Sequence, residues 1–172
     1  MTAKVEMSSE KLLLRELTEE DVCERYLRWL REGEATKYIS AASSTHDLQD
    51  LRRYVCDRIG REDVLFLGIF DKESGLHIGN IKYEPVDRAL GYAVMGILVG
   101  DPAYRGKGVG TDALVTSARW LKEQWGIKQI LLGVYESNVA GVRSYEKAGF
   151  VVADTPYIKK YVPGQITMVW DL

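Results

Sequence analysis

Residues 97–111 read ILVGDPAYRGKGVGT. An apolar run ends at Val99, a loop with three alternating glycines follows, and the chain then continues into a helical pattern. Glycines allow unusual backbone dihedral angles and close approach of the backbone to a ligand. The free N–H groups at a helix start, together with the helix dipole, favour an anion. The segment therefore predicts a strand, a loop and a helix that bind phosphate or pyrophosphate, with Arg105 and Lys107 as charges beside it.

Two common phosphate-binding patterns do not fit this loop. The Walker pattern fails because Gly108, rather than Ser or Thr, follows Lys107, and because Asp101 occupies the position of its first glycine. The dinucleotide pattern fails because Thr111 occupies the position of its last glycine. A tight structural turn without a ligand is the alternative interpretation of the loop.

Helical and strand-like segments surround this unit on both sides. The hydrophobic period predicts strands over 12–17, 64–70, 76–83, 92–99, 129–135, 157–162 and 165–170. Capping residues and glycine stops predict helices from Thr18 to Gly33, from Asp47 to Gly60, from Thr111 to Gly126 and from Asn138 to Gly149. No repeat or linker divides the chain, so residues 1–172 are expected to form one α+β domain (α/β, three-layered) around one central sheet.

The composition excludes several classes of function. The 23 Lys and Arg residues against 25 Asp and Glu give a net charge of −2, which argues against a nucleic-acid groove. No apolar run approaches the roughly 18 residues of a membrane span, and the N-terminus lacks an apolar signal core, so the expected location is the cytoplasm. Two histidines and two distant cysteines do not form a convincing metal site, so no metal is expected.

A second motif follows the next predicted strand, where residues 138–150 read NVAGVRSYEKAGF. Together the two motifs resemble the GNAT superfamily of acyl-CoA-dependent N-acyltransferases. The loop matches the family's [QR]-x-x-G-x-[GA] pattern at Arg105, Gly108 and Gly110. The helix matches N-x-x-[AG]-x-x-x-Y-x-[KR]-x-G-F at Asn138, Tyr145, Lys147, Gly149 and Phe150. More loosely, residues 14–18 and the Trp29 helix resemble the subgroup that acetylates ribosomal-protein N-termini.

The resemblance implies acetyl-CoA as the cosubstrate and a sheet split between the parallel strands 92–99 and 129–135. The pantetheine arm would pair with the backbone of the first of these strands, as an added strand does, with a backbone N–H near Leu98 binding the developing oxyanion. The cofactor-binding residues implied in this way are Ile97, Leu98, Val99, Gly100, Arg105, Gly106, Lys107, Gly108, Val109, Gly110, Thr111, Asn138, Tyr145 and Lys147.

The resemblance also implies direct attack of an amine on acetyl-CoA, with Tyr145 as the acid that protonates the departing thiolate. The general base is open, because Val94 occupies a position where relatives often carry Glu. Glu84 is the first candidate, and Asp87, Glu136, a water chain or an acceptor that arrives neutral are the others. Close packing of the chain against CoA would also suit Gly141, where Ala is commoner.

The leading hypothesis is an N-acetyltransferase whose acceptor is a protein N-terminus, an amino sugar, a polyamine or an antibiotic. Segment 26–62, the loop 84–88 and the hairpin 157–165 are expected to build the acceptor site, with tyrosines 38, 54, 157 and 161 as candidate lining residues. A non-catalytic acyl-CoA-binding or regulatory module is the alternative, supported by Val94, and a nucleotide-phosphate enzyme is a third reading. Both a monomer and a homodimer are compatible with the sequence.

Overall fold

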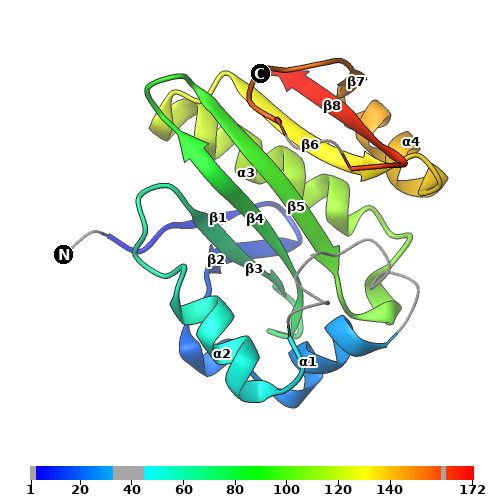
Figure 1. Ribbon diagram of the computed structural model, residues 1–172. Coiled ribbons are helices and arrows are strands. Elements are labelled where there is room, and N and C mark those ends of the chain that lie inside the picture. The colour runs from blue at the N-terminus through cyan, green and yellow to red at the C-terminus, as the bar shows by residue number, and fades with distance from the viewer. Residues whose placement is uncertain (1–2, 33–44, 160–161) are drawn as a thin grey trace.

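A computed structural model describes residues 3–32, 45–159 and 162–172. The described residues form eight strands in one mixed sheet, in the order β1-β2-β3-β4-β5-β6-β8-β7 (Figure 1). The strands are β1 (Glu6–Ser8), β2 (Leu12–Glu16), β3 (Leu65–Asp71), β4 (His77–Asp87), β5 (Tyr92–Val99), β6 (Gln129–Tyr135), β7 (Val151–Val152) and β8 (Gln165–Asp171). The α-helices are α1 (Glu24–Arg31), α2 (Leu48–Cys56), α3 (Val109–Trp125) and α4 (Val139–Ala148).

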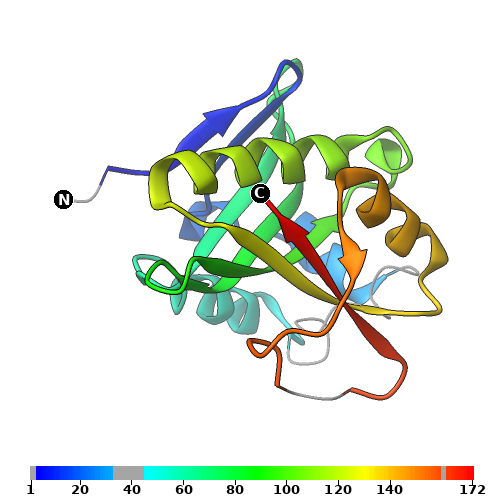
Figure 2. The same ribbon diagram turned by 90° about the horizontal axis from the view of Figure 1, so that it is seen from above.

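Helices cover both faces of the sheet. Figure 2 shows α3 and α4 on one side of the strands and α1 and α2 on the other. Each face has its own buried cluster. One joins α3 to the strands through residues such as Leu114 and Leu121, and the other joins α1 and α2 to β3 through residues such as Leu30 and Leu51. The three-layered architecture expected from the sequence is therefore confirmed.

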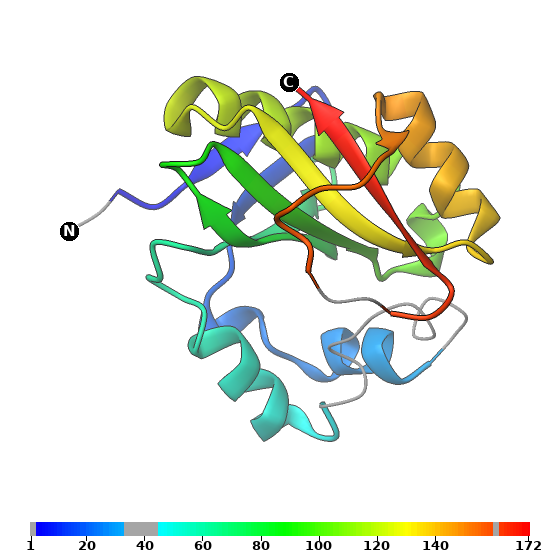
Figure 3. The ribbon, with the colours of Figure 1, turned by 45° about the horizontal axis from the view of Figure 1, so that its top comes forward.

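The sheet splits between β5 and β6. These two strands run parallel and pair at only three positions, the last of which is Val94 with Leu131. Beyond that pair they diverge, while β5 stays paired with β4 and β6 with β8 (Figure 3). The split expected between strands 92–99 and 129–135 is confirmed, and both strands have the predicted bounds.

The first predicted helix is in fact two short helices. Thr18 begins a 3-10 turn over Glu19–Asp21 with a reciprocal capping box, and α1 begins separately after Cys23. Val22 between them is extended, with φ −78° and ψ 111°, and its side chain is buried. The extended backbone at Val22 interrupts a pattern that reads as one continuous helix. The expected helix end, Gly33, lies outside the described residues.

Other differences lie at the ends of elements. Strand β4 continues through Glu84 to Asp87, so the predicted loop 84–88 is largely strand. Helix α2 ends at Cys56, four residues before the predicted end at Gly60, and Ile59 beyond it is 50% exposed. In the tail, 157–159 are not a strand, residues 160–161 lie outside the description, and the short β7 pairs with β8 instead.

Candidate active site

The glycine loop ends in a helix start with free backbone donors. Gly106 and Gly108 have φ of 69° and 79°, which only glycine adopts readily, and Gly108 is the N-cap of α3. The first N–H that bonds within the helix is that of Asp112, to the Gly108 carbonyl at 2.9 Å. The N–H groups of residues 109–111 therefore have no partner inside the helix, and no side chain caps them. This arrangement suits an anion such as pyrophosphate.

Arg105 closes the loop against the end of β5. Its Nε donates to the Val99 carbonyl at 2.9 Å and its Nη2 donates to the Gly100 carbonyl at 3.0 Å. Both bonds fix the loop to the strand, so part of the guanidinium serves the loop's own structure. Lys107 is exposed and does not line the cleft described below.

The edge of β5 that faces the split follows from the alternation of backbone groups along a strand. On the β6 side, the Gly91 carbonyl accepts bonds from Lys128 at 2.7 Å and from Gln129 at 3.1 Å. On the β4 side, the Leu98 carbonyl lies so close to Gly79 that a Cβ there would overlap it. Odd-numbered residues of β5 therefore direct their backbone groups to the split, which places the free N–H on Ile97 and Val99, next to the expected Leu98.

Gly100 belongs to the packing of this strand end. Its N–H donates to the Ile78 carbonyl at 3.0 Å, and a Cβ at this position would overlap the Trp29 ring. Close approach of Trp29 to the backbone therefore requires glycine here.

One cleft of ≈ 1720 Å³ joins the split, the glycine loop, α4 and the α1–α2 side of the sheet. Most of the cofactor residues expected from the sequence line it, namely Ile97, Leu98, Val99, Arg105, Gly106, Gly108, Val109, Gly110, Thr111, Asn138 and Tyr145. Gly100, Lys107 and Lys147 are not among its lining residues.

Helix α4 presents Asn138 and Tyr145 to this cleft. The Asn138 side chain accepts a bond from the Gly141 N–H at 3.1 Å and so caps the helix. The Tyr145 ring packs edge-on against Phe150, with ring centroids 5.7 Å apart. Burial raises the pKa of the Tyr145 hydroxyl above its ordinary value. The phenol is therefore protonated at neutral pH and can serve as an acid.

Glu84 does not line the cleft but belongs to an ion-pair cluster. Its carboxylate lies 2.8 Å from Arg58, 3.1 Å from Lys82 and 3.3 Å from Arg61. Partial burial pushes the pKa of Glu84 up, but the hydrogen bonds from Arg58 and Lys82 outweigh it and hold the pKa below its usual value. A carboxylate held in this way is a poor proton acceptor. Asp87 and Glu136 are also absent from the lining residues.

The other half of the cleft is lined by side chains that the two motifs do not include. Asn80 and Lys82 come from β4, Tyr26 from α1 and Tyr54 from α2. Asn80 and Lys82 alternate with apolar residues in 78–83. This alternation indicates that both side chains lie on the same face of the strand, opposite its apolar face.

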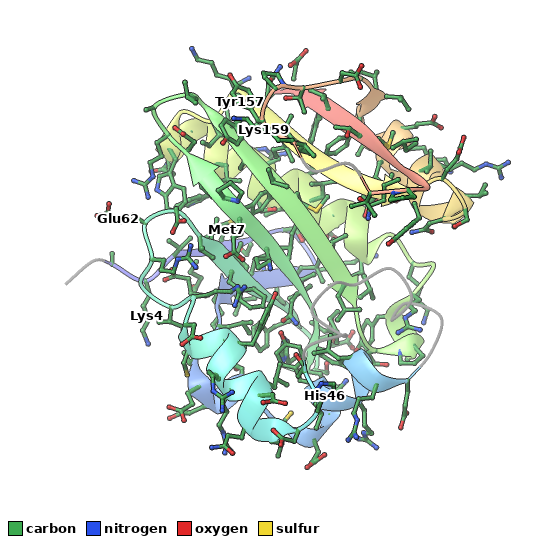
Figure 4. The ribbon with its side chains drawn as sticks, viewed as in Figure 1. Lys4, Met7, His46, Glu62, Tyr157 and Lys159 are labelled. Atoms are coloured by element: carbon green, nitrogen blue, oxygen red, sulfur yellow. The ribbon has the colours of Figure 1, made fainter. Side chains whose placement is uncertain are left out.

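Only part of the expected acceptor site is found in the cleft. From segment 26–62, the cleft is lined by His46, just before α2, and by Tyr54, near the end of α2. From the tail it is lined by Ile158, Val162 and Gln165. Tyr157 instead stacks on Tyr92, with ring centroids 4.0 Å apart, near the start of β5 and far from His46 (Figure 4). Tyr38 and Tyr161 lie outside the described residues.

Within residues 3–32, 45–159 and 162–172, no helix combines the length and apolar character needed to cross a membrane. The same residues hold no cluster of three or more His, Cys, Asp or Glu side chains placed to bind a metal ion.

Known proteins are similar to this chain in sequence and in fold. Residues 11–151 match the family model described as acetyltransferase (GNAT) domain. The uncharacterized N-acetyltransferase YobR of Bacillus subtilis (strain 168) is 33% identical over 85 residues, which cover 49% of this chain and 32% of that protein. The chain spans a third or less of the length of the curated relatives it matches.

Solved structures extend the likeness over nearly the whole chain. The ribosomal L7/L12 α-N-protein acetyltransferase RimL in complex with coenzyme A superposes with a TM-score of 0.81 at 15% identity, covering 95% of this chain and 96% of the other. A chimera of the spermidine N-acetyltransferase SpeG from Vibrio cholerae gives a TM-score of 0.76 at 19% identity, covering 93% and 95%. At these identities the likeness concerns the fold. The family match over residues 11–151, on a sheet split beside a glycine loop, shows that this chain belongs to the GNAT acetyltransferase family.

Proposed function

We propose that this protein transfers an acetyl group from acetyl-CoA to a primary amine. The observation that carries the proposal is one cleft that holds residues of the free edge of β5, the helix start of α3 and Tyr145 together. Each part suits a different portion of acetyl-CoA.

The residues present fit this cosubstrate. The unbonded N–H groups of residues 109–111 suit the pyrophosphate. The Ile97 carbonyl and the Val99 N–H, which face the split, suit the amides of the pantetheine arm. Asn138 borders the same path at the start of α4. The thioester would then lie where β5 and β6 separate, beyond Val94.

The proposed reaction is a direct displacement. The neutral amine nitrogen bonds to the acetyl carbon, the Ile97 N–H donates to the oxygen as it gains charge, and the carbon–sulfur bond breaks. The Tyr145 hydroxyl gives its proton to the thiolate. The surplus proton of the new amide nitrogen leaves to water, and the tyrosine recovers its proton from solvent.

The deprotonation of the amine does not need a carboxylate in this scheme. Val94 lies in the cleft where relatives often carry Glu, and Glu84 is held by cations outside it. The α-amino group of a peptide chain has an ordinary pKa of about 7.7–8.0, against about 10.4 for a lysine amine, so the neutral fraction at a given pH differs strongly between acceptors. We therefore propose that the acceptor amine reaches the site neutral, and that the rate follows its neutral fraction.

A non-catalytic acyl-CoA-binding module is the second candidate, and Val94 is the observation that favours it. A thiol-release assay with acetyl-CoA and a panel of amines, with the products identified by mass spectrometry, decides between the two. An acetylated amine, formed in step with released CoA, is the expected result. Tight binding of acetyl-CoA, with no acetylated product from any amine, would instead support the module.

A further inference from the structure

Three polar side chains converge in the cleft on the side of the sheet that α1 and α2 cover. Asn80 and Lys82 lie two residues apart on β4, so they share one face of the sheet, roughly 6.5 Å apart along the strand. Tyr54 approaches from α2, and the Lys82 Nζ lies 2.6 Å from its hydroxyl oxygen. All three side chains line the cleft.

The hydrogen bonds already made leave these groups as donors. An ammonium has three donors and no acceptor, and Lys82 directs two of its donors to Tyr54 and Glu84. The Tyr54 oxygen accepts from Lys82, so its own proton points elsewhere. The Asn80 Oδ1 lies 2.7 Å from the His77 Nε2 and accepts its proton, which leaves the amide N–H groups of Asn80 for a ligand. A donor set of this kind suits a ligand rich in oxygen acceptors.

The charge beside these donors is positive. The ion pairs around Glu84 join the cations Arg58, Arg61 and Lys82 to two carboxylates, those of Glu84 and Asp63. One positive charge is therefore in excess within the cluster. The Arg58 guanidinium also lies over the Tyr54 ring, 3.8 Å from its centroid, which keeps that charge next to the donor set.

The space for a ligand lies directly beside Lys82. Gly96 on β5 is the pairing partner of Lys82, it is exposed, and a Cβ there would meet nothing within 4 Å. The next residue is Ile97, whose N–H faces the split. A small group bound at Lys82 over Gly96 therefore leaves an amine on the same molecule within a few ångström of the proposed thioester position.

From this juxtaposition we infer that the acceptor is an amine that carries a carboxylate or phosphate group near its nitrogen, and that Lys82, Tyr54 and Asn80 bind that group. The inference rests on the proposed function and narrows it. Polyamines and aminoglycosides carry several positive charges, which the excess charge around Lys82 repels.

Matched acceptors test the inference on the wild-type protein. The panel comprises amino acids and their carboxamides, O-phosphoethanolamine with ethanolamine, and spermidine. All are assayed at one pH, and kcat/KM is calculated from the concentration of the neutral amine. We expect the anionic member of a pair to be favoured ten- to a hundredfold, and the better pair tells carboxylate from phosphate. Turnover with ratios near one, or a preference for spermidine, overturns this inference and leaves the proposed acetyl transfer in place. Acetyl-CoA binding without turnover of any amine overturns the proposed function and with it the inference.

Two variants locate the effect. Lys82→Met keeps the aliphatic stem and removes the charge, so the preference for the anionic member should fall to near one, mainly through KM. Lys72→Met is the matched control, because Lys72 donates to the Ser9 carbonyl at 2.6 Å and does not line the cleft. Unchanged acetyl-CoA affinity confirms that Lys82→Met is folded. A Lys82→Met protein that binds acetyl-CoA and keeps the full preference for the anionic acceptor overturns the role of Lys82. If this variant does not fold, the ratios measured on the wild-type protein still test the inference.

Discussion

Tyr145 combines three properties that are compatible with its role as the general acid of the proposed reaction. It lines the cleft, its ring is held against Phe150, and burial keeps its pKa above the ordinary value, so the hydroxyl carries its proton at any physiological pH. The helix that carries it also begins at the cleft, through the Asn138 cap. At the scale of the residue, the proposed reaction relies on a proton donor that is carried by a helix beginning at the cleft.

Replacing Tyr145 with Phe removes the proton donor and keeps the ring. Since general acid catalysis contributes typically 10²–10⁴-fold, we expect kcat to fall within roughly that range while the affinity for acetyl-CoA changes little. Steady-state kinetics and isothermal titration calorimetry measure the two quantities. Tyr157→Phe is the control, because that ring stacks on Tyr92 and does not line the cleft. An unchanged kcat in Tyr145→Phe would remove this residue from the mechanism.

At the scale of the element, the start of α3 is the part of the fold most directly shaped by the sequence. Gly108 takes a left-handed conformation that directs the free N–H groups of the first turn into the cleft. A Cβ at this glycine would meet nothing within 4 Å, so its backbone angle, and not a lack of space, requires the residue. Loop and helix thus provide local backbone donors for the proposed anion site, which suits a chain with a net charge of −2.

Gly108→Ala tests this anion site. A left-handed alanine costs roughly 1–2 kcal/mol, so the variant relieves strain by shifting the loop, and we expect the Kd for acetyl-CoA to rise at least fivefold. Gly60→Ala is a matched control, since Gly60 has a φ of 78°, also has open space around a Cβ, and lies outside the cleft. Both variants should lose several degrees of Tm, and only Gly108→Ala should lose affinity. Equal affinity in the two would show that this turn does not bind the pyrophosphate.

At the scale of the whole molecule, a partly buried histidine links the sheet to α1. The His77 ring stacks on Phe70 at 4.8 Å between centroids, meets Trp29 at 5.0 Å, and bonds to Asn80. Burial lowers the pKa of His77, and the hydrogen bond to Asn80 offsets this only in part. In the unfolded chain the imidazole takes up a proton near pH 6.5. The unfolded state therefore binds more protons below that pH, and the folded state loses stability as the pH falls.

The free energy of unfolding should accordingly decrease between pH 7.5 and pH 5.5, by at most about 1.4 kcal/mol per pH unit from this group. His77→Phe should flatten the dependence, whatever its effect on absolute stability, while His46→Gln, at an exposed position, should leave it in place. Urea unfolding at several pH values gives these slopes. A His77→Phe slope equal to that of wild type would assign the dependence to other groups, since carboxylates titrate mostly at lower pH.

The local parts of this protein could be predicted from its sequence. Strands β5 and β6 have the predicted bounds, because their apolar runs end at turn residues. The glycine loop and the Asn138 cap are likewise as expected, because backbone angles and caps depend on neighbouring residues. The helical period does not predict the break at Val22, because burial of this side chain is compatible with both a helical and an extended backbone.

The convergence of distant residues was decided by the tertiary structure. Strand register directs Ile97 rather than Leu98 to the split, and it sets Lys82 beside the open space over Gly96. Packing of α2 on the sheet brings Arg58 to Glu84 and withdraws that carboxylate from the cleft. Thus the sequence by itself determined the glycine loop, the start of α3 and the Asn138 cap, because these depend on neighbouring residues and backbone angles. The acceptor half depends on side chains tens of residues apart, and only the folded sheet and helices bring these together.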